Sequence, residues 1–168
     1  GEGIESFFFP EKELCRLKEQ MEISPSFANK VAYAEGLQKS GKFEEALTIY
    51  TDISSGPNGE DPSIWEGFAH AYFQIGAYEK VPPAIQKMRL YRDKQRPDGF
   101  NLLLPRALHK MGELEQAEKE YQELAESFNG EEGRCRYALF LKETGREEEA
   151  NVIFQDILIH ARASPAYY

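Results

Sequence analysis

Residues 136–154 read RYALFLKETGREEEANVIF, which is two helix-like segments that meet at Gly145. Apolar residues recur at helical spacing before the glycine, and the same spacing resumes after the three glutamates Glu147 to Glu149. A glycine just past a helix end can adopt the left-handed backbone conformation that closes the helix. Glutamates in the first turn of the helix that follows the glycine interact favourably with the positive end of the dipole of that following helix. The stretch therefore predicts two antiparallel helices joined by a tight turn.

This pattern of two helices joined at a glycine occurs four times. The turn glycines, separated by 35, 36 and 33 residues, are Gly41, Gly76, Gly112 and Gly145. A small residue stands seven positions before and five positions after each glycine, with Pro105 as the exception: Ala34, Ala46, Ala69, Val81, Ala117, Ala138 and Ala150. Large apolar residues follow each glycine by nine and twelve positions: Tyr50, Ile53, Ile85, Met88, Tyr121, Leu124, Phe154 and Ile157. The small residues let paired helices approach closely, and the large ones fill the seam between pairs. This agreement argues against an ordinary helical bundle whose loops happen to contain glycine.

The repeated pattern resembles the tetratricopeptide repeat family, whose unit is a helix–turn–helix of about 34 residues. Trp65, eleven residues before Gly76, also stands where the family favours tryptophan. The resemblance implies an all-α fold, a right-handed superhelical solenoid of antiparallel helix pairs. Residues 1–24 are then an N-terminal segment with a capping helix, and residues 25–168 are the repeat domain. The expected repeats span residues 25–60, 61–96, 97–129 and 130–162.

Helix bounds follow from the turn glycines and from start signals. We expect helices at 10–22, 25–39, 42–54, 62–75, 79–95, 98–111, 114–127, 131–144 and 147–162. Ser24–Pro25 and Asp61–Pro62 each pair a capping side chain with a proline in the first turn. Pro82 and Pro83 predict a late or distorted helix start, and Pro105, in mid-helix, predicts a kink.

Composition and charge bound the function. The chain has 168 residues and a formal net charge of -9, which argues against a nucleic-acid groove. No stretch reaches the roughly 18 uncharged apolar residues of a membrane-spanning helix. Cys15 and Cys135 lack Cys-x-x-Cys spacing, so we expect free thiols in a reducing compartment and a cytoplasmic location. Because the chain begins with Gly1 rather than methionine, a membrane anchor outside this sequence stays open.

The sequence carries no recognisable catalytic or metal-ligating constellation. His70, His109 and His160 fall in different predicted helices, and none has metal-ligand spacing to another ligand type. The glycines occur singly at helix ends rather than in a phosphate-binding loop. The paired carboxylates stand at helix starts and on solvated faces. We therefore expect no metal, no cofactor and no enzymatic activity.

The tetratricopeptide resemblance also implies where a partner binds. In that family, contacts come from the first helix of each pair, about ten, six, three and two positions before the turn glycine. In the first unit these positions hold Val31, Glu35, Gln38 and Lys39. The candidate groove residues over all units are Glu35, Glu66, His70, Phe73, Leu102, Arg106, His109, Lys110, Leu139 and Lys142. Their mixture of apolar and basic side chains predicts a protein or peptide partner with apolar anchors and some negative charge.

A known ligand mode of the family is not expected. Chaperone-binding members grip a carboxylate-terminated tail with lysine, asparagine and arginine side chains. The corresponding positions here hold Val31, Glu35, Gly67, Gly99 and Leu103. None of these can form that clamp.

The last predicted helix suggests a second kind of interaction. Its apolar residues cover more of the circumference than one seam needs, and we expect a self-association face, giving a possible homodimer, at Ile153, Phe154, Ile157 and Leu158. The leading interpretation is a protein-binding adaptor. The alternative, from the resemblance to membrane-anchored bacterial tetratricopeptide proteins, is the soluble assembly domain of such a factor acting through self-association.

Overall fold

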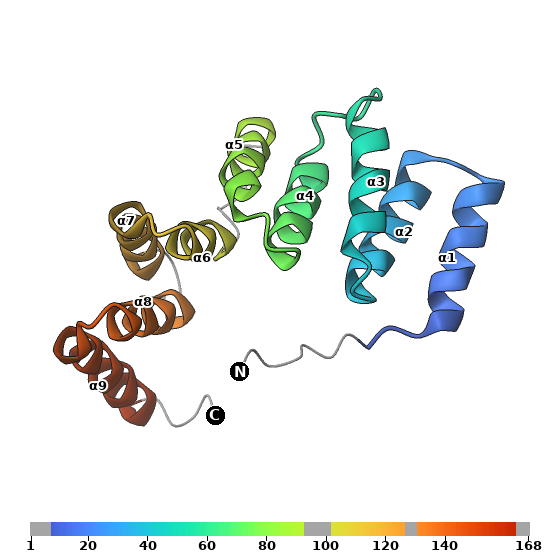
Figure 1. Cartoon of the computed structure of the whole chain (residues 1–168). Helices are drawn as coiled ribbons and strands as arrows, with labels where there is room; N and C mark the ends of the chain where they lie inside the picture. The colour runs from blue at the N-terminus through green and yellow to red at the C-terminus, as the bar shows by residue number, and fades with distance from the viewer. Residues whose placement is uncertain (1–7, 93–101, 127–130, 164–168) are drawn as a thin grey trace. The chain divides into compact units, whose positions relative to one another are not determined.

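The computed structural model describes residues 8–92, 102–126 and 131–163. In these residues the chain forms nine α-helices and one short 3-10 helix and contains no β-strand, so the prediction of an all-α fold is confirmed. The helices fall into two compact units, unit 1 (Gly1–Pro97) and unit 2 (Asp98–Tyr168). Figure 1 shows unit 1 in blue to green and unit 2 in yellow to red.

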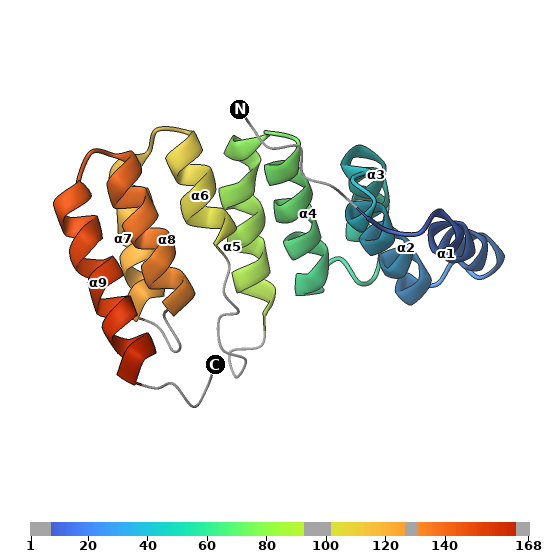
Figure 2. The same cartoon turned by 90° about the horizontal axis from the view of Figure 1, so that it is seen from below.

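Unit 1 is a succession of helices in which each packs against the next. Its elements are α1 (Glu11–Ile23), α2 (Phe27–Lys39), α3 (Phe43–Ser54), α4 (Pro62–Gln74), η1 (Tyr78–Lys80) and α5 (Val81–Tyr91). Figures 1 and 2 show these helices following one another in chain order from α1 to α5. Helix α2 also touches α4, the first helix of the next pair. Leu14 of α1 is buried, and Leu17 reaches over Gly36 of α2. The N-terminal helix α1 therefore packs against the first helix of the first pair.

Unit 2 continues the same pattern with two helix pairs. Its elements are α6 (Leu103–Lys110), α7 (Leu114–Glu126), α8 (Glu131–Glu143) and α9 (Glu147–Ala163). Helix α7 packs against both α6 and α8, and α8 packs against α9. A core cluster of Ala138, Leu141 and Ala150 joins α8 to α9, with Ile153 and Phe154 packed against it.

The four turn glycines adopt the predicted left-handed conformation, with φ between 75° and 86°. The same pair of hydrogen bonds closes the helix before each of them. After α8, the amide of Gly145 donates to the carbonyl of Lys142 at 3.1 Å, and the amide of Arg146 donates to the carbonyl of Leu141 at 2.7 Å. These two bonds define the Schellman closure of a helix. One local device is thus used four times.

The residues seven positions before and five positions after each turn glycine lie in the core. All eight are buried: Ala34, Ala46, Ala69, Val81, Pro105, Ala117, Ala138 and Ala150. Helices approach closely only where the residues at their contact are small. The spacing rule read from the sequence therefore identifies the line of contact within each helix pair.

The capping residue of α2 differs from the prediction, whereas that of α4 agrees with it. The cap of α2 is Ser26, whose side chain accepts from the amide of Asn29 at 3.1 Å, so the assignment to Ser24–Pro25 was wrong. Asp61 does cap α4, accepting from the amide of Ser63 at 2.9 Å. Residues 93–101, where predicted helices end and begin, lie outside the described residues.

The three prolines that were expected to disturb helices stand in first turns, where a missing amide hydrogen leaves no bond unmade. Pro82 and Pro83 are the second and third residues of α5, and η1 comes directly before this helix, so it starts late as expected. Pro105 is the third residue of α6 and not a mid-helix residue. The predicted kink was therefore wrong, because the helix begins at Leu103 instead of near residue 98.

Candidate functional site

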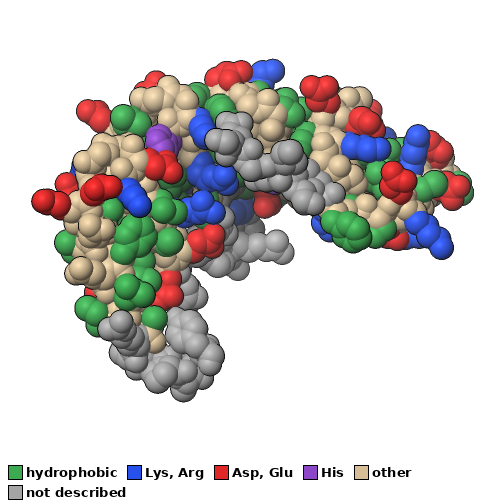
Figure 3. Space-filling view, turned by 60° about the horizontal axis from the view of Figure 1, so that its bottom comes forward, with side chains coloured by type: hydrophobic (Ala, Val, Ile, Leu, Met, Phe, Trp, Pro, Cys, Tyr) green, Lys and Arg blue, Asp and Glu red, His purple; other side chains and the backbone are tan. Residues whose placement is uncertain are grey.

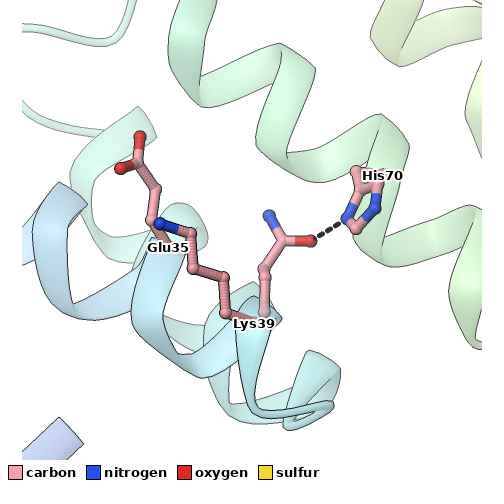
Figure 4. Close-up of a pocket in the computed structure, with 4 residues that line it drawn as sticks. Glu35, Lys39 and His70 are labelled. Carbon is pink, nitrogen blue, oxygen red and sulfur yellow. Dashed lines mark hydrogen bonds between the residues drawn. The ribbon is translucent and has the colours of Figure 1, made fainter. Parts of the chain in front are cut away.

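Two of the predicted groove residues of unit 1 line one pocket. Glu35 of α2 and His70 of α4 border a pocket of about 310 Å³, together with Gln38 and Lys39 (Figure 4). These residues stand six, three and two positions before Gly41 and six positions before Gly76. Equivalent positions of two successive helix pairs thus meet at one place.

The pocket rests on a buried amide, that of Gln38. Its Nε2 donates to the hydroxyl of Tyr50 at 3.0 Å and to the carbonyl of Gly67 at 3.3 Å. Its Oε1 accepts from Nδ1 of His70, the dashed line in Figure 4. A buried amide is costly unless both its ends are hydrogen-bonded. Gln38 therefore ties α2, α3 and α4 together beneath the pocket.

These contacts set the orientation of the His70 ring. Because the amide oxygen of Gln38 can only accept, Nδ1 of His70 carries a hydrogen whether or not the ring is charged. The ring of Phe43 meets the His70 ring edge-on, with 6.0 Å between the centroids. The imidazole is thus held by two neighbouring helices.

The rim of the pocket carries opposite charges. Glu35 and Lys39 lie one turn apart on α2, and in Figure 4 the Lys39 side chain runs toward Glu35. The ammonium of Lys39 also lies 5.9 Å from the centroid of the Phe9 ring. A carboxylate, an ammonium and an imidazole at one opening can form hydrogen bonds and ion pairs with polar peptide groups.

The other two candidates of unit 1 differ in exposure. Glu66 is exposed on α4, one turn before His70. Phe73 is only 7% exposed and meets the ring of Tyr78 edge-on, with 5.2 Å between the centroids. Phe73 is therefore an interior residue and is poorly placed to anchor a ligand.

In unit 2, the last turns of α6 and α8 lie side by side. The ring of His109 on α6 meets the ring of Phe140 on α8 edge-on at 5.1 Å, and its Nδ1 lies 3.6 Å from the carboxylate of Glu143. The six candidates placed on these two elements or just before them are Leu102, Arg106, His109, Lys110, Leu139 and Lys142. All six candidates therefore lie on, or just before, the first helices of the two helix pairs in unit 2.

Arg136 joins this set, although the positional rule of the family passes over it. It stands one turn before Leu139 on α8 and is half-buried. Burial raises the pKa of Tyr121, and the positive charges of Arg106 and Arg136 oppose that rise. The charges of both guanidinium groups therefore act on the Tyr121 hydroxyl. The sequence alone does not single out Arg136, because its position one turn before Leu139 becomes informative only when Leu139 is seen to be exposed.

The predicted self-association face of α9 is partly turned inward. Ile153 and Phe154 pack against the unit 2 core, and Ile157 is half-buried. Leu158 is 56% exposed. Two other apolar residues of this helix, which the expected face did not include, are also exposed: Val152 at 68% and Ile159 at 63%. Figure 3 shows apolar side chains exposed on the part of unit 2 that α9 forms.

Other features of the described residues bear on chemistry. No group of three or more His, Cys, Asp or Glu side chains in them could hold a metal ion. Cys15 and Cys135 are free thiols, and Cys15 is exposed. None of the helices in this part of the chain is both long and apolar enough to cross a bilayer.

Comparison with known proteins adds no assignment. The sequence matches no protein-family model, and no curated protein is significantly similar to it.

Proposed function

We propose that this protein is a non-enzymatic scaffold that binds a peptide or protein partner through the first helices of its helix pairs. The single observation that carries the proposal is the pocket of unit 1. Residues at equivalent repeat positions on α2 and α4 form it, and a buried glutamine fixes its floor. Repeated helix pairs that present side chains from the same positions form extended binding surfaces.

The proposal includes the tetratricopeptide type of fold. The supporting features are the four identical turn closures and the eight buried compact residues beside them. In the proposed arrangement all four pairs stack in chain order as a right-handed superhelical solenoid. Each pair then buries the apolar side of the next, which an isolated pair cannot do.

A direct binding measurement tests the scaffold proposal. Cross-linking in cells followed by mass spectrometry identifies partners, and each partner is then purified and titrated against wild-type protein and Lys39→Glu. We expect the reversed charge at the pocket to weaken binding about tenfold. Lys12→Glu, on the exposed side of α1, is the matched control and should bind as wild type.

Two outcomes would contradict the proposal. One is that no cross-linked protein binds the purified chain. The other is that a bound partner is insensitive to charge reversal at the pocket and also at the basic residues of α6 and α8. Catalytic turnover of any partner would contradict the non-enzymatic part.

A second candidate function rests on α9. Val152, Leu158 and Ile159 are exposed apolar residues on one helix, and exposed apolar residues gathered together mark association surfaces. We propose as the alternative that the chain is the assembly domain of a membrane-anchored bacterial factor and pairs with a second copy through this helix.

A further inference from the structure

The loop that joins α3 to α4 (Figure 1) contains an asparagine followed directly by a glycine, Asn58–Gly59. In such a pair the backbone nitrogen of the glycine can attack the side-chain carbonyl carbon of the asparagine. A glycine hinders this attack least, because it has no side chain and restricts the backbone little. Asn58 is exposed and Gly59 is half-buried. The loop therefore carries a deamidation-prone pair inside a folded part of the chain.

The deamidation of Asn58 needs only water as a second reactant. In the first step, the Gly59 nitrogen forms a bond to Cγ of Asn58, and the bond from Cγ to the side-chain nitrogen breaks. Ammonia leaves, taking up the hydrogen of the Gly59 amide, and a five-membered succinimide remains. In the second step, water opens this ring at one of its two carbonyl carbons. The product is aspartate or isoaspartate, and nothing is oxidised or reduced.

Three hydrogen bonds hold the Asn58–Gly59 pair in a turn. The amide of Gly59 donates to the carbonyl of Gly56 at 3.2 Å. The amide of Asp61 donates to the carbonyl of Asn58 at 3.0 Å. The indole Nε1 of Trp65 donates to the carbonyl of Gly59 at 2.8 Å. The nitrogen that must attack is thus engaged elsewhere, and breaking such bonds costs free energy.

Trp65 is a firm anchor for this loop. Its ring packs against that of Phe68, with 5.1 Å between the centroids, and the ammonium of Lys87 lies 4.5 Å from the centroid of the indole. A cation over an aromatic face is attracted to it. At the other side of the loop, a β-carbon on Gly59 would lie 2.3 Å from the carbonyl oxygen of Ser54. The loop is therefore fixed between the end of α3 and the ring of Trp65.

We infer that Asn58 is a modification site, which converts spontaneously to aspartate or isoaspartate when this loop opens, and that Trp65 keeps the loop closed. Isoaspartate adds one carbon atom to the main chain, so the turn cannot re-form the same hydrogen bonds. Conversion therefore loosens irreversibly the connection between the first and second helix pairs of unit 1. This inference is independent of the proposed scaffold function.

Peptide mapping by mass spectrometry tests the inference. The full chain is incubated in mildly alkaline buffer, with and without denaturing urea, and the fraction of Asn58 that has been converted is followed with time. Conversion in the folded chain requires opening of the loop, whereas the unfolded chain is always open. We expect conversion to be at least about tenfold slower in the folded chain.

A matched pair of variants tests the role of Trp65. Trp65→Phe removes the indole donor but keeps an aromatic ring, and it should accelerate the conversion of Asn58 about fivefold. Tyr72→Phe is the control, because Tyr72 is another half-buried aromatic residue of α4 whose ring stacks on Phe68 at 5.6 Å. No described contact joins Tyr72 to the loop, so this variant should convert at the wild-type rate. Circular dichroism verifies that both variants are folded.

A measurement on the wild-type chain separates opening of the loop from global unfolding. At urea concentrations below the unfolding midpoint, exchange of the Trp65 indole hydrogen is followed by nuclear magnetic resonance. This exchange and the conversion of Asn58 should accelerate in parallel while the far-ultraviolet circular dichroism stays constant. The comparison also decides the role of Trp65 if Trp65→Phe does not fold.

The modification site is overturned if Asn58 is not converted even in the unfolded chain, or if the folded and unfolded chains convert it equally fast. The role of Trp65 is overturned if Trp65→Phe, once folded, converts no faster than Tyr72→Phe. It is overturned as well if indole exchange and conversion do not rise together in the wild-type chain.

Discussion

A missing side chain, that of Gly67, lets α3 and α4 pack in unit 1. A β-carbon at this position would lie 2.3 Å from the Tyr50 ring. The ring cannot move aside easily, because it is 2% exposed and its hydroxyl is held by Gln38. It also packs against Phe68, with 5.7 Å between the centroids. The same glycine offers its carbonyl to the amide that supports the pocket. Packing and site geometry therefore depend on one residue.

Gly67→Ala should destabilise unit 1 by about 1–3 kcal/mol. Alanine would gain about 0.5–1 kcal/mol from helix propensity, but the clash with a fixed ring outweighs this gain. Urea unfolding followed by the fluorescence of Trp65, the single tryptophan, measures the change in unit 1. In a Tyr50→Leu background the cost should shrink, as a double-mutant cycle would show.

Gly36→Ala is the control for this experiment. A β-carbon there would meet the flexible end of Leu17 at 2.9 Å, which can shift at small cost. An equal cost at Gly36 and Gly67, or no coupling to Tyr50, would show that the ring contact does not limit the site.

Tyr50 also links the stability of unit 1 to pH. Burial raises its pKa above the value of about 10 found in unfolded chains. The folded state then keeps the phenolic proton more firmly than the unfolded state. The stabilisation is full below pH of about 10 and is lost as pH rises above that value. Tyr50→Phe should therefore be less stable than wild type at pH of about 9, and the difference in their unfolding free energies should become smaller as pH increases to about 11. Urea midpoints from Trp65 fluorescence at each pH measure this. A constant deficit across that range would mean that ionisation of Tyr50 does not contribute.

At the scale of the helix, local backbone chemistry made most of the fold predictable. Gly41, Gly76, Gly112 and Gly145 close helices through two hydrogen bonds that involve only the neighbouring backbone, so the turns could be read directly. Helix ends that depend on contacts with distant residues could not be predicted in this way. The start of α6 was misplaced because proline is compatible with both a first turn and a kink.

Replacing a turn glycine by alanine should cost about 1–2 kcal/mol at Gly76, Gly112 and Gly145 alike, since an L-residue with positive φ is strained. No atom lies within 4 Å of the β-carbon position at these glycines, so the cost is conformational and not steric. Asparagine tolerates this conformation better and should recover part of the loss. Thermal unfolding followed by circular dichroism compares the variants. Equal stability of the alanine and glycine proteins at any of these positions would contradict the role of positive φ there.

The candidate site was less predictable than the helices, for reasons visible in particular residues. The positional rule named Phe73, but the prolines that delay α5 leave room for η1, and η1 brings Tyr78 against the Phe73 ring. The family's positional rule named Gln38 as a groove residue. The structure shows that Gln38 is buried and donates to acceptors on α3 and α4, and no local sequence pattern reveals those acceptors. Side-chain partners across helices, and not spacing, decide which residues remain accessible.

At the scale of the whole molecule, the repeat period predicts the succession of helix pairs along the chain, but it does not predict how these pairs divide into compact units. The division into unit 1 and unit 2 falls between the second and third pairs, close to the expected repeat boundary at residue 97. All four turns are closed alike, so nothing in the turn pattern marks that division. The division depends on contacts between pairs, which the turn residues do not encode.

The exposed apolar side chains of α9 make a prediction about the whole molecule in solution. If a second copy covers them, sedimentation velocity should show the mass of the wild-type protein rising with concentration. Leu158→Lys/Ile159→Lys should weaken this association by at least about tenfold, because each buried side chain of this kind contributes about 1.5 kcal/mol or more. Thr48→Lys/Thr51→Lys, two exposed positions on α3, adds the same charge away from α9 and should leave the association unchanged. A wild-type protein that sediments as a monomer at every concentration would exclude the assembly function, whereas association disrupted equally by both pairs would place the interface elsewhere.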